Sequence, residues 1–177
     1  MKHTEDALER AKKIRLIAFD VDGVLTDGRV NMGPGGEAFK SFDIKDGLGI
    51  TQWQKAGGKT AIITGRESEI VARRAAELHI PAVFQGCLDK RAAYAELKER
   101  FGLDDTEIAY MGDDLIDLPL LTRAGFAAAV ADAVPEVRDR VHLVTDRPGG
   151  HGAARELVEF IMGAQGRWDD VVRAFLQ

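Results

Sequence analysis

The chain has 177 residues, 45% of them hydrophobic and 30% charged, with 24 Lys and Arg against 29 Asp and Glu for a net charge of −5. This length lies within the ~100–200 residues of an ordinary domain, and it predicts a single domain over residues 1–177. The acidic balance argues against a nucleic-acid partner, which needs a basic face. No stretch approaches the ~18 consecutive apolar residues of a membrane span, so no membrane partner is expected.

The cysteine content and the N-terminus predict a cytoplasmic location. Cys87 is the single cysteine, so the chain contains no internal disulfide. The opening stretch "MKHTEDALERAKKIR" lacks the apolar segment of a signal peptide. The four histidines have no paired spacing of the kind that binds zinc.

Short apolar runs alternate with segments of helical period along the chain. Strands are predicted at residues 14–19, 59–64, 82–85, 108–111, 127–130 and 142–144, and helices at 46–56, 67–78, 89–101 and 115–123. The alternation predicts an α/β fold built from βαβ units, with a parallel sheet flanked by helices on both faces. In such sheets ligands bind beyond the carboxyl ends of the strands.

One segment interrupts this alternation directly after the first strand. "GRVNMGPGGEAFKSFDI" carries two strand-like pieces around the turn residues Gly33, Pro34, Gly35 and Gly36. It predicts a β-hairpin insertion over about residues 28–44. Two roles remain open, because the hairpin either leans over the residues that follow the first strand or forms a surface extension of the sheet.

Polar side chains follow the predicted strands where each one ends. In chain order they are Asp20 and Asp22, then Thr64 and Arg66, then Lys90, and finally Asp113, Asp114 and Asp117. If the strands are parallel neighbours, these groups gather at one edge of the sheet. Local roles are the alternative, because Thr64 is a candidate helix N-cap and the Asp114 and Asp117 pair suits the first turn of a helix.

Together these residues predict a site for a metal ion and a phosphate. Carboxylates that outnumber their basic partners favour Mg²⁺, which takes oxygen ligands. Lys90 and Arg66 lie near predicted helix N-termini, where the macrodipole disfavours a cation by ~0.3–1 kcal/mol unless an anion is present. A carboxylate approaching a phosphate meets repulsion of ~4 kcal/mol per unit-charge pair at 4 Å, which a metal and a lysine offset. The pattern therefore favours phosphoryl transfer, with one carboxylate as nucleophile and another as acid/base.

These motifs resemble those of a known enzyme superfamily. "DVDGVLTDG", "ITGR", Lys90 and "GDDLID" are similar, in this order, to the four motifs of the haloacid dehalogenase (HAD) superfamily of phosphohydrolases. "GLGI", "FQGCLDK", "MGDDLIDLPLL" and "GGHGAARELVEFIMGAQG" further resemble the 3-deoxy-D-manno-octulosonate 8-phosphate (KDO 8-phosphate) phosphatase family, over residues 14–166. The resemblance implies a Rossmann-like HAD fold without a cap domain.

The resemblance also implies roles for the candidate residues. Asp20 would attack phosphorus and become an aspartyl phosphate, and Asp22 would protonate the leaving sugar oxygen and then activate water. Thr64 and Lys90 would hold phosphoryl oxygens. Mg²⁺ would be bound by the Asp20 carboxylate, the Asp22 carbonyl and Asp113. Asp114 and Asp117 would lie in the outer shell of the metal site. Arg66 and Arg74 would contact the substrate carboxylate.

The implied activity is hydrolysis of KDO 8-phosphate to KDO and phosphate in lipopolysaccharide precursor biosynthesis. A phosphatase for a nine-carbon sugar acid 9-phosphate, of KDN or N-acetylneuraminate type, is the nearest alternative. A non-catalytic phosphosugar-binding protein is a further one. Relatives of this kind form homotetramers in which hairpins meet at the centre and a neighbouring subunit closes each active site, so the expected partners are a phosphorylated sugar acid and three further copies of the chain.

The C-terminal part, about residues 151–177, is predicted to be a helical tail. For residues 149–152, "GGHG", the family resemblance implies a mobile tail that can approach an active site. The alternative is a plain hinge before a helix. Further on, an apolar i, i+3, i+4, i+7, i+8 pattern predicts an amphipathic helix. Its apolar face is expected to pack on the core, with packing on a neighbouring copy as the alternative. The residues of that pattern are Trp168, Val171, Val172, Phe175 and Leu176.

Overall fold

The computed structural model describes residues 1–176 and is built around a seven-stranded sheet with the strand order β1-β9-β8-β7-β2-β5-β6. The strands are β1 Lys2–His3, β2 Leu16–Phe19, β5 Lys59–Ile63, β6 Ala82–Phe84, β7 Ile108–Gly112, β8 Phe126–Ala129 and β9 Leu143–Val144. All neighbours pair in parallel except β1, which runs antiparallel to β9. The predicted parallel sheet and its six strands are therefore confirmed, and β1 was not predicted.

The centre of the sheet explains why the first apolar run is continuous. Every residue of β2 is buried, and β2 lies between β5 and β7, which pair with it in parallel. A strand covered on both faces needs no polar alternation. Phe19, the last residue of β2, is in register with Ile62 of β5 and Met111 of β7. The residues that follow these three strands consequently meet at one edge.

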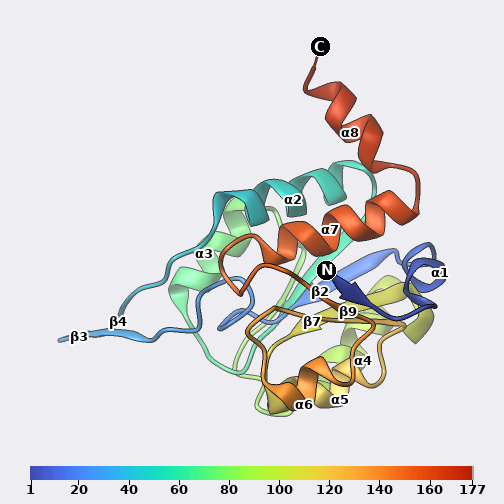
Figure 1. Cartoon of the computed structure of the whole chain (residues 1–177). Helices are drawn as coiled ribbons and strands as arrows, with labels where there is room; N and C mark the ends of the chain where they lie inside the picture. Colours follow the sequence, from blue (N-terminus) through green and yellow to red (C-terminus); the bar gives the residue numbers. More distant parts are fainter. Residues whose placement is uncertain (177) are drawn as a thin grey trace.

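Helices cover both faces of this sheet (Figure 1). Their bounds are α1 Ala7–Ala11, α2 Ile44–Lys55, α3 Glu69–Glu77, α4 Lys90–Phe101, α5 Leu118–Leu121, α6 Pro135–Arg138, α7 Ala153–Ala164 and α8 Trp168–Ala174, with 3₁₀ turns η1 Asp105–Glu107 and η2 Leu115–Asp117. α2 and α7 lie side by side on one face, and α4, α5 and α6 lie on the other. Among the described residues, no helix is both long and apolar enough to cross a bilayer.

The helix predicted over 115–123 is divided into η2 and α5. Pro119 lies in the first turn of α5, where its missing N–H costs nothing, but in the interior of a longer helix it would remove a hydrogen bond. Three other helices have N-caps of the expected chemistry, with Asp43, Ser68 and Asp89 capping α2, α3 and α4. Thr64 is not a cap, because the cap of α3 is Ser68.

The insertion after β2 is a β-hairpin, as predicted. Its strands, β3 Asn31–Gly33 and β4 Gly36–Phe39, pair with each other in a separate two-stranded sheet. Figure 1 shows this hairpin projecting away from the main body, so it does not extend the central sheet. The described residues include no cap domain.

The last helix departs from the prediction in part. Trp168 and Val171 of α8 pack against the core, but Val172, Phe175 and Leu176 are exposed by 44%, 64% and 80%. Gly166 adopts a φ of +68°, a left-handed conformation that suits glycine and ends the path of α7. As Figure 1 shows, α8 therefore extends past the end of α7, and only its first turns reach the body.

Candidate active site

A pocket of about 370 Å³ opens at the carboxyl edge of β2, β5 and β7. Its lining includes, in chain order, Asp20, Asp22, Gly28, Val30, Thr64, Gly65, Arg66, Leu88, Lys90, Asp113, Asp114 and Ile116. Seven of the sequence-predicted site residues are thus brought together from segments far apart in the chain. Asp117 lies buried beside them, and Arg74 lies elsewhere.

The floor of this pocket is a buried ion pair network around Lys90. The ammonium lies 2.8 Å from Asp20 Oδ1 and 2.7 Å from Asp117 Oδ1, and its side chain is completely buried. Burial alone would lower the pKa of Lys90, but the two carboxylates raise it above its ordinary value. Lys90 is the first residue of α4, where a cation opposes the helix dipole. The anions that face Lys90 here are the carboxylates of Asp20 and Asp117, and the phosphate that the sequence led us to expect beside it stays a prediction.

Asp117 organises the loop that follows β7. Its Oδ1 accepts hydrogen bonds from Lys90 and, at 2.6 Å, from the Tyr110 hydroxyl. Its Oδ2 accepts from the backbone N–H groups of Asp113 at 2.9 Å and Asp114 at 3.2 Å. Both oxygens are therefore used by protein donors. The Asp114 side chain accepts from the N–H of Leu115, so its local capping role is also real.

Three carboxylates in this region are close enough to share one cation. Oxygens of Asp20, Asp113 and Asp117 lie within 4.8 Å of one another. Asp113 Oδ1 is buried and has no hydrogen-bond partner, although most buried polar atoms have one. Since Asp117 is already saturated by donors, the oxygens open to an ion are those of Asp20 and Asp113. This set of hard oxygen donors fits a Mg²⁺ ion.

The pKa shifts of these carboxyl groups also favour a cation at the cluster. Burial raises the pKa of Asp20 to about 6, and the charge of Asp117 adds to the effect. Burial, Asp117 and Asp20 raise the pKa of Asp113 to about 8. One lysine does not neutralise three buried acids, so their ionised forms are unfavourable until a further cation arrives.

Asp22 lies in a different environment from Asp20. Its side chain is 20% exposed, and it takes no part in the carboxylate cluster. It pairs with Lys40, from the segment after the hairpin, and Arg66 Nε lies 3.9 Å away. Asp20 and Asp22, which are separated by one residue, therefore lie in different electrostatic environments. Different environments allow two carboxylates to take different chemical roles. Lys40 was not predicted from the sequence.

Thr64 and Gly23 shape the rest of the floor. Thr64 is 2% exposed at the end of β5, where its backbone N–H donates to the carbonyl of Phe84. Gly23 has a φ of +91°, and a Cβ atom there would lie 2.0 Å from Asp113 Oδ2. Only glycine allows the turn after Asp22 to approach the acidic loop this closely.

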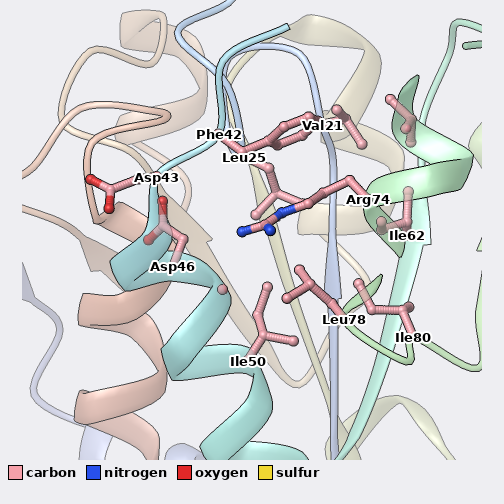
Figure 2. A pocket seen from close by; sticks show the side chains of 12 residues that line it. Val21, Leu25, Phe42, Asp43, Asp46, Ile50, Ile62, Arg74, Leu78 and Ile80 are labelled. Carbon is pink, nitrogen blue, oxygen red and sulfur yellow. The ribbon is translucent and has the colours of Figure 1, made fainter. Parts of the chain in front are cut away.

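Arg74 does not line this pocket. Its guanidinium reaches from α3 toward α2 beneath the Phe42 ring, as Figure 2 shows, into a cavity of about 10 Å³ that holds roughly one water molecule. There Arg74 Nη1 donates to Glu77 at 2.9 Å, and Nε has no partner. Within one protomer Arg74 is thus apart from the site where the sequence placed it.

The "GGHG" stretch packs against the turn that follows Asp22 and is not a free tail. Gly150 donates its N–H to the carbonyl of Val24 at 2.9 Å, in the turn that follows Asp22. A Cβ on Gly149 would lie 1.8 Å from the carbonyl oxygen of Gly23, so the contact requires glycine. The stretch leads directly into α7. It is a packed turn before a helix, close to the hinge alternative.

HAD-type phosphohydrolases share this arrangement, with an aspartate pair after a central strand (here β2), a lysine that begins a later helix (α4) and an acidic loop after a neighbouring strand (β7). A family model described as haloacid dehalogenase-like hydrolase matches residues 82–157. The chain is 42% identical over 165 residues to KDO 8-phosphate phosphatase KdsC of Escherichia coli K12, covering 93% of this chain and 88% of the relative.

Two solved structures share the fold closely. One is KDO 8-phosphate phosphatase from Moraxella catarrhalis in complex with magnesium, phosphate and KDO, with a TM-score of 0.94, 39% identity, and 98% of this chain and 99% of that chain covered. The other is the Yersinia pestis KDO 8-phosphate phosphatase, with a TM-score of 0.91, 42% identity, and 93% and 89% covered. The chain belongs to the KDO 8-phosphate phosphatase (KdsC) family.

Proposed function

We propose that this protein is a Mg²⁺-dependent phosphatase that hydrolyses KDO 8-phosphate to KDO and inorganic phosphate, in lipopolysaccharide precursor biosynthesis. The observation that carries the proposal is the division of labour between Asp20 and Asp22. Asp20 is buried against Lys90 and the acidic cluster, while Asp22 faces the pocket and contacts only basic groups. Relatives at 42% identity carry this activity in their name, and one solved relative holds magnesium, phosphate and KDO.

Mg²⁺ would be held by the carboxylates of Asp20 and Asp113, with the backbone carbonyl of Asp22 as the third protein ligand that the family resemblance implies. The ion, when bound, supplies positive charge that offsets the repulsion between a carboxylate nucleophile and a phosphate. Asp117 and Asp114 act from outside, by fixing the loop that carries Asp113. The unpartnered Asp113 oxygen is the direct support for this assignment.

The chain's own residues then divide the reaction in two. A carboxylate oxygen of Asp20 attacks phosphorus while the bond from phosphorus to the sugar oxygen breaks, and Asp22 donates a proton to that oxygen. Asp22 next takes a proton from water as the water oxygen attacks phosphorus, and the bond to Asp20 breaks to release phosphate. Lys90 and Thr64 hold phosphoryl oxygens, and Lys90 also fixes the Asp20 carboxylate.

The sugar acid's own carboxylate would meet Arg66, which is 41% exposed at the pocket mouth. Arg74, to which the resemblance assigns the same task, lies outside the pocket of its own protomer and borders a separate surface hollow, so in this proposal it acts from a neighbouring copy. Apolar side chains that line the pocket are exposed in the single chain, Leu88 by 79% and Val30 by 48%, and these support a neighbouring copy at this position. The assembly proposed is a homotetramer. A cytoplasmic location suits the single cysteine.

Phosphate release is the test of this function. The purified protein would be incubated with KDO 8-phosphate or with a nine-carbon sugar acid 9-phosphate, each with Mg²⁺ and with EDTA. We expect metal-dependent turnover that favours the eight-carbon acid. Preference for the nine-carbon acid would change the substrate and leave the chemistry intact. Absence of turnover with either ester, in a folded protein, would contradict the proposal and favour a phosphosugar-binding role.

A further inference from the structure

The hairpin supplies the site with a buried cation that the sequence motifs do not contain. Lys40 directly follows β4, and its side chain is only 1% exposed. The ammonium pairs with Asp22 Oδ1 and lies 2.9 Å from Glu37 Oε1. A buried lysine is stable only where acidic partners surround it, so the positions of Lys40 and of Asp22 depend on each other.

Glu37, within β4, holds this lysine in place from the other side. Its carboxylate accepts a hydrogen bond from the Ser68 hydroxyl, and Arg66 Nη2 lies 3.3 Å from its Oε1. With Arg66 Nε 3.9 Å from Asp22, two acids and two cations form a closed ring. The hairpin contributes one half of the ring, and the segments after β2 and β5 contribute the other half.

Each of the two reacting carboxylates thus has a lysine of its own. Lys90, from α4, fixes Asp20, and Lys40, from the hairpin, fixes Asp22. Asp22 lies in a loop, and a side chain there has rotamers that do not point at the leaving oxygen. Holding it in one orientation removes that entropic cost from the reaction barrier.

We propose that Lys40 is a positioning residue that aims Asp22 at the leaving sugar oxygen and then at the attacking water, and that Glu37 keeps Lys40 in this position. The proposal rests on the proposed function for the two-step chemistry, but not for the identity of the sugar acid. It makes the hairpin part of the catalytic apparatus.

The first experiment compares Lys40→Met, Lys40→Arg and Glu37→Gln with wild type and with Lys45→Met, an exposed lysine nearby. On the sugar acid phosphate, Lys40→Met should lower kcat by roughly 10–100-fold, a part of the 10²–10⁴ that general acid–base catalysis supplies. KM should change much less. Lys40→Arg should recover part of kcat, Glu37→Gln should show a smaller loss, and Lys45→Met should match wild type.

A second experiment uses p-nitrophenyl phosphate, whose leaving group departs as an anion and needs no proton. With it, Lys40→Met should keep a wild-type burst of nitrophenolate and lose only the steady-state rate, because water activation still needs Asp22. A loss of fold would lower burst and steady state together. Glu37→Gln, which leaves Lys40 paired with Asp22, should show the same pattern in weaker form.

The outcomes separate this proposal from the proposed function. An unchanged kcat in Lys40→Met would overturn the positioning role. If KM rises while kcat stays unchanged, the role is overturned as well, because Lys40 would then bind the substrate directly. A wild-type protein that cleaves only the aryl phosphate would contradict the substrate assignment and still test Lys40 by its burst. A wild type that cleaves neither ester would overturn both.

Discussion

At the scale of single residues, the site depends on Asp117 as much as on the reacting acids. It is completely buried, and its two oxygens accept hydrogen bonds from Lys90, Tyr110 and two backbone N–H groups. This arrangement leaves Asp20 and Asp113 with oxygens available to a cation. Asp117 therefore stabilises the loop after β7 and leaves the other two carboxylates as the proposed metal ligands.

We expect Asp117→Ala to destabilise the protein by ~3 kcal/mol, because the Tyr110 hydroxyl and the backbone N–H groups of Asp113 and Asp114 lose their shared acceptor, and a buried donor left unsatisfied costs ~1–3 kcal/mol. Urea unfolding of the variant and of wild type, both in EDTA, measures the difference. Asp114→Ala is the matched control, since Asp114 is exposed at the pocket mouth and its side chain caps the first turn of η2 and takes no part in the buried network. A difference below ~1 kcal/mol would show that Asp117 is not structural.

Removal of metal should be visible in stability as well as in activity. Mg²⁺ binds the folded site and not the unfolded chain, so excess Mg²⁺ over EDTA should raise the melting temperature of wild type. Asp20→Asn removes a ligand and the nucleophile, and it should abolish both this rise and phosphate release. In EDTA its melting temperature should be no lower than that of wild type, since ionised Asp20 is unfavourable there. Residual turnover in Asp20→Asn would contradict the covalent route.

Which site residues could be predicted follows from where they lie in the chain. Asp20, Thr64, Lys90 and Asp113 each follow a strand of a parallel sheet, so the topology alone brings them to one edge. Lys40 and Glu37 could not be found in this way, because their contacts depend on how the hairpin returns to the body. No periodic or motif signal specifies that path.

At the scale of elements, the N-terminus of α7 is held by a residue of α2. Gly152, the N-cap of α7, has no side chain, and Asp46 accepts hydrogen bonds from the N–H groups of Gly152 at 3.2 Å and Arg155 at 2.8 Å. Asp46 thus acts as a cap supplied from a distant part of the chain. It joins α2 and α7 where the turn at 149–152 supports the catalytic loop.

Asp46 should give the stability of the protein a pH dependence. Burial raises its pKa from 3.8 to about 6. The folded state therefore binds the proton more tightly than the unfolded state, and the stabilisation is complete below pH ~4 and lost as pH rises through ~6. Relative to Asp46→Asn, wild type should lose up to ~1.4 kcal/mol per pH unit between pH 4 and 6. Above that window the two curves should run parallel.

Urea unfolding at several pH values measures this slope. Asp169→Asn, an identical change at an exposed carboxylate, should follow wild type at every pH. Equal slopes for wild type and Asp46→Asn would show that Asp46 does not titrate in this range.

Element predictions failed where local pattern was weak or was overridden. β1 is two exposed polar residues, and it exists because its backbone pairs with β9. The helix over 115–123 was divided by Pro119. The apolar pattern of α8 predicts a core-facing helix, yet the left-handed Gly166 directs most of that face away from the body. For β1 and α8 a distant contact or one backbone angle decides the outcome, whereas Pro119 is a local signal that the sequence itself carries.

At the scale of the whole molecule, the exposed hairpin is the feature that a single chain does not explain. Two-stranded hairpins are marginal in water unless they pack against something. This one projects from the body, and Met32 and Phe39 on it are exposed by 68% and 56%. Lys40, at the end of the hairpin nearest the body, pairs with Asp22. A partner that packs on the hairpin would therefore also affect the position of Asp22, the proposed catalytic acid. A self-assembled centre of hairpins would bury this apolar surface and link assembly to chemistry.

Substitution of Phe39 by glutamate tests this link. A charge in a hairpin interface would be desolvated without a partner, so Phe39→Glu should convert the proposed tetramer into smaller species, as measured by light scattering after size exclusion. Leu8→Glu, an exposed apolar position on α1, is the matched control and should leave the mass unchanged. A hairpin that no longer packs in the assembly holds Lys40 less firmly. We therefore expect kcat to fall in the same variant in which the measured particle mass falls. Full activity in a monomeric Phe39→Glu protein would separate assembly from the chemistry, and an unchanged mass would place the interface elsewhere.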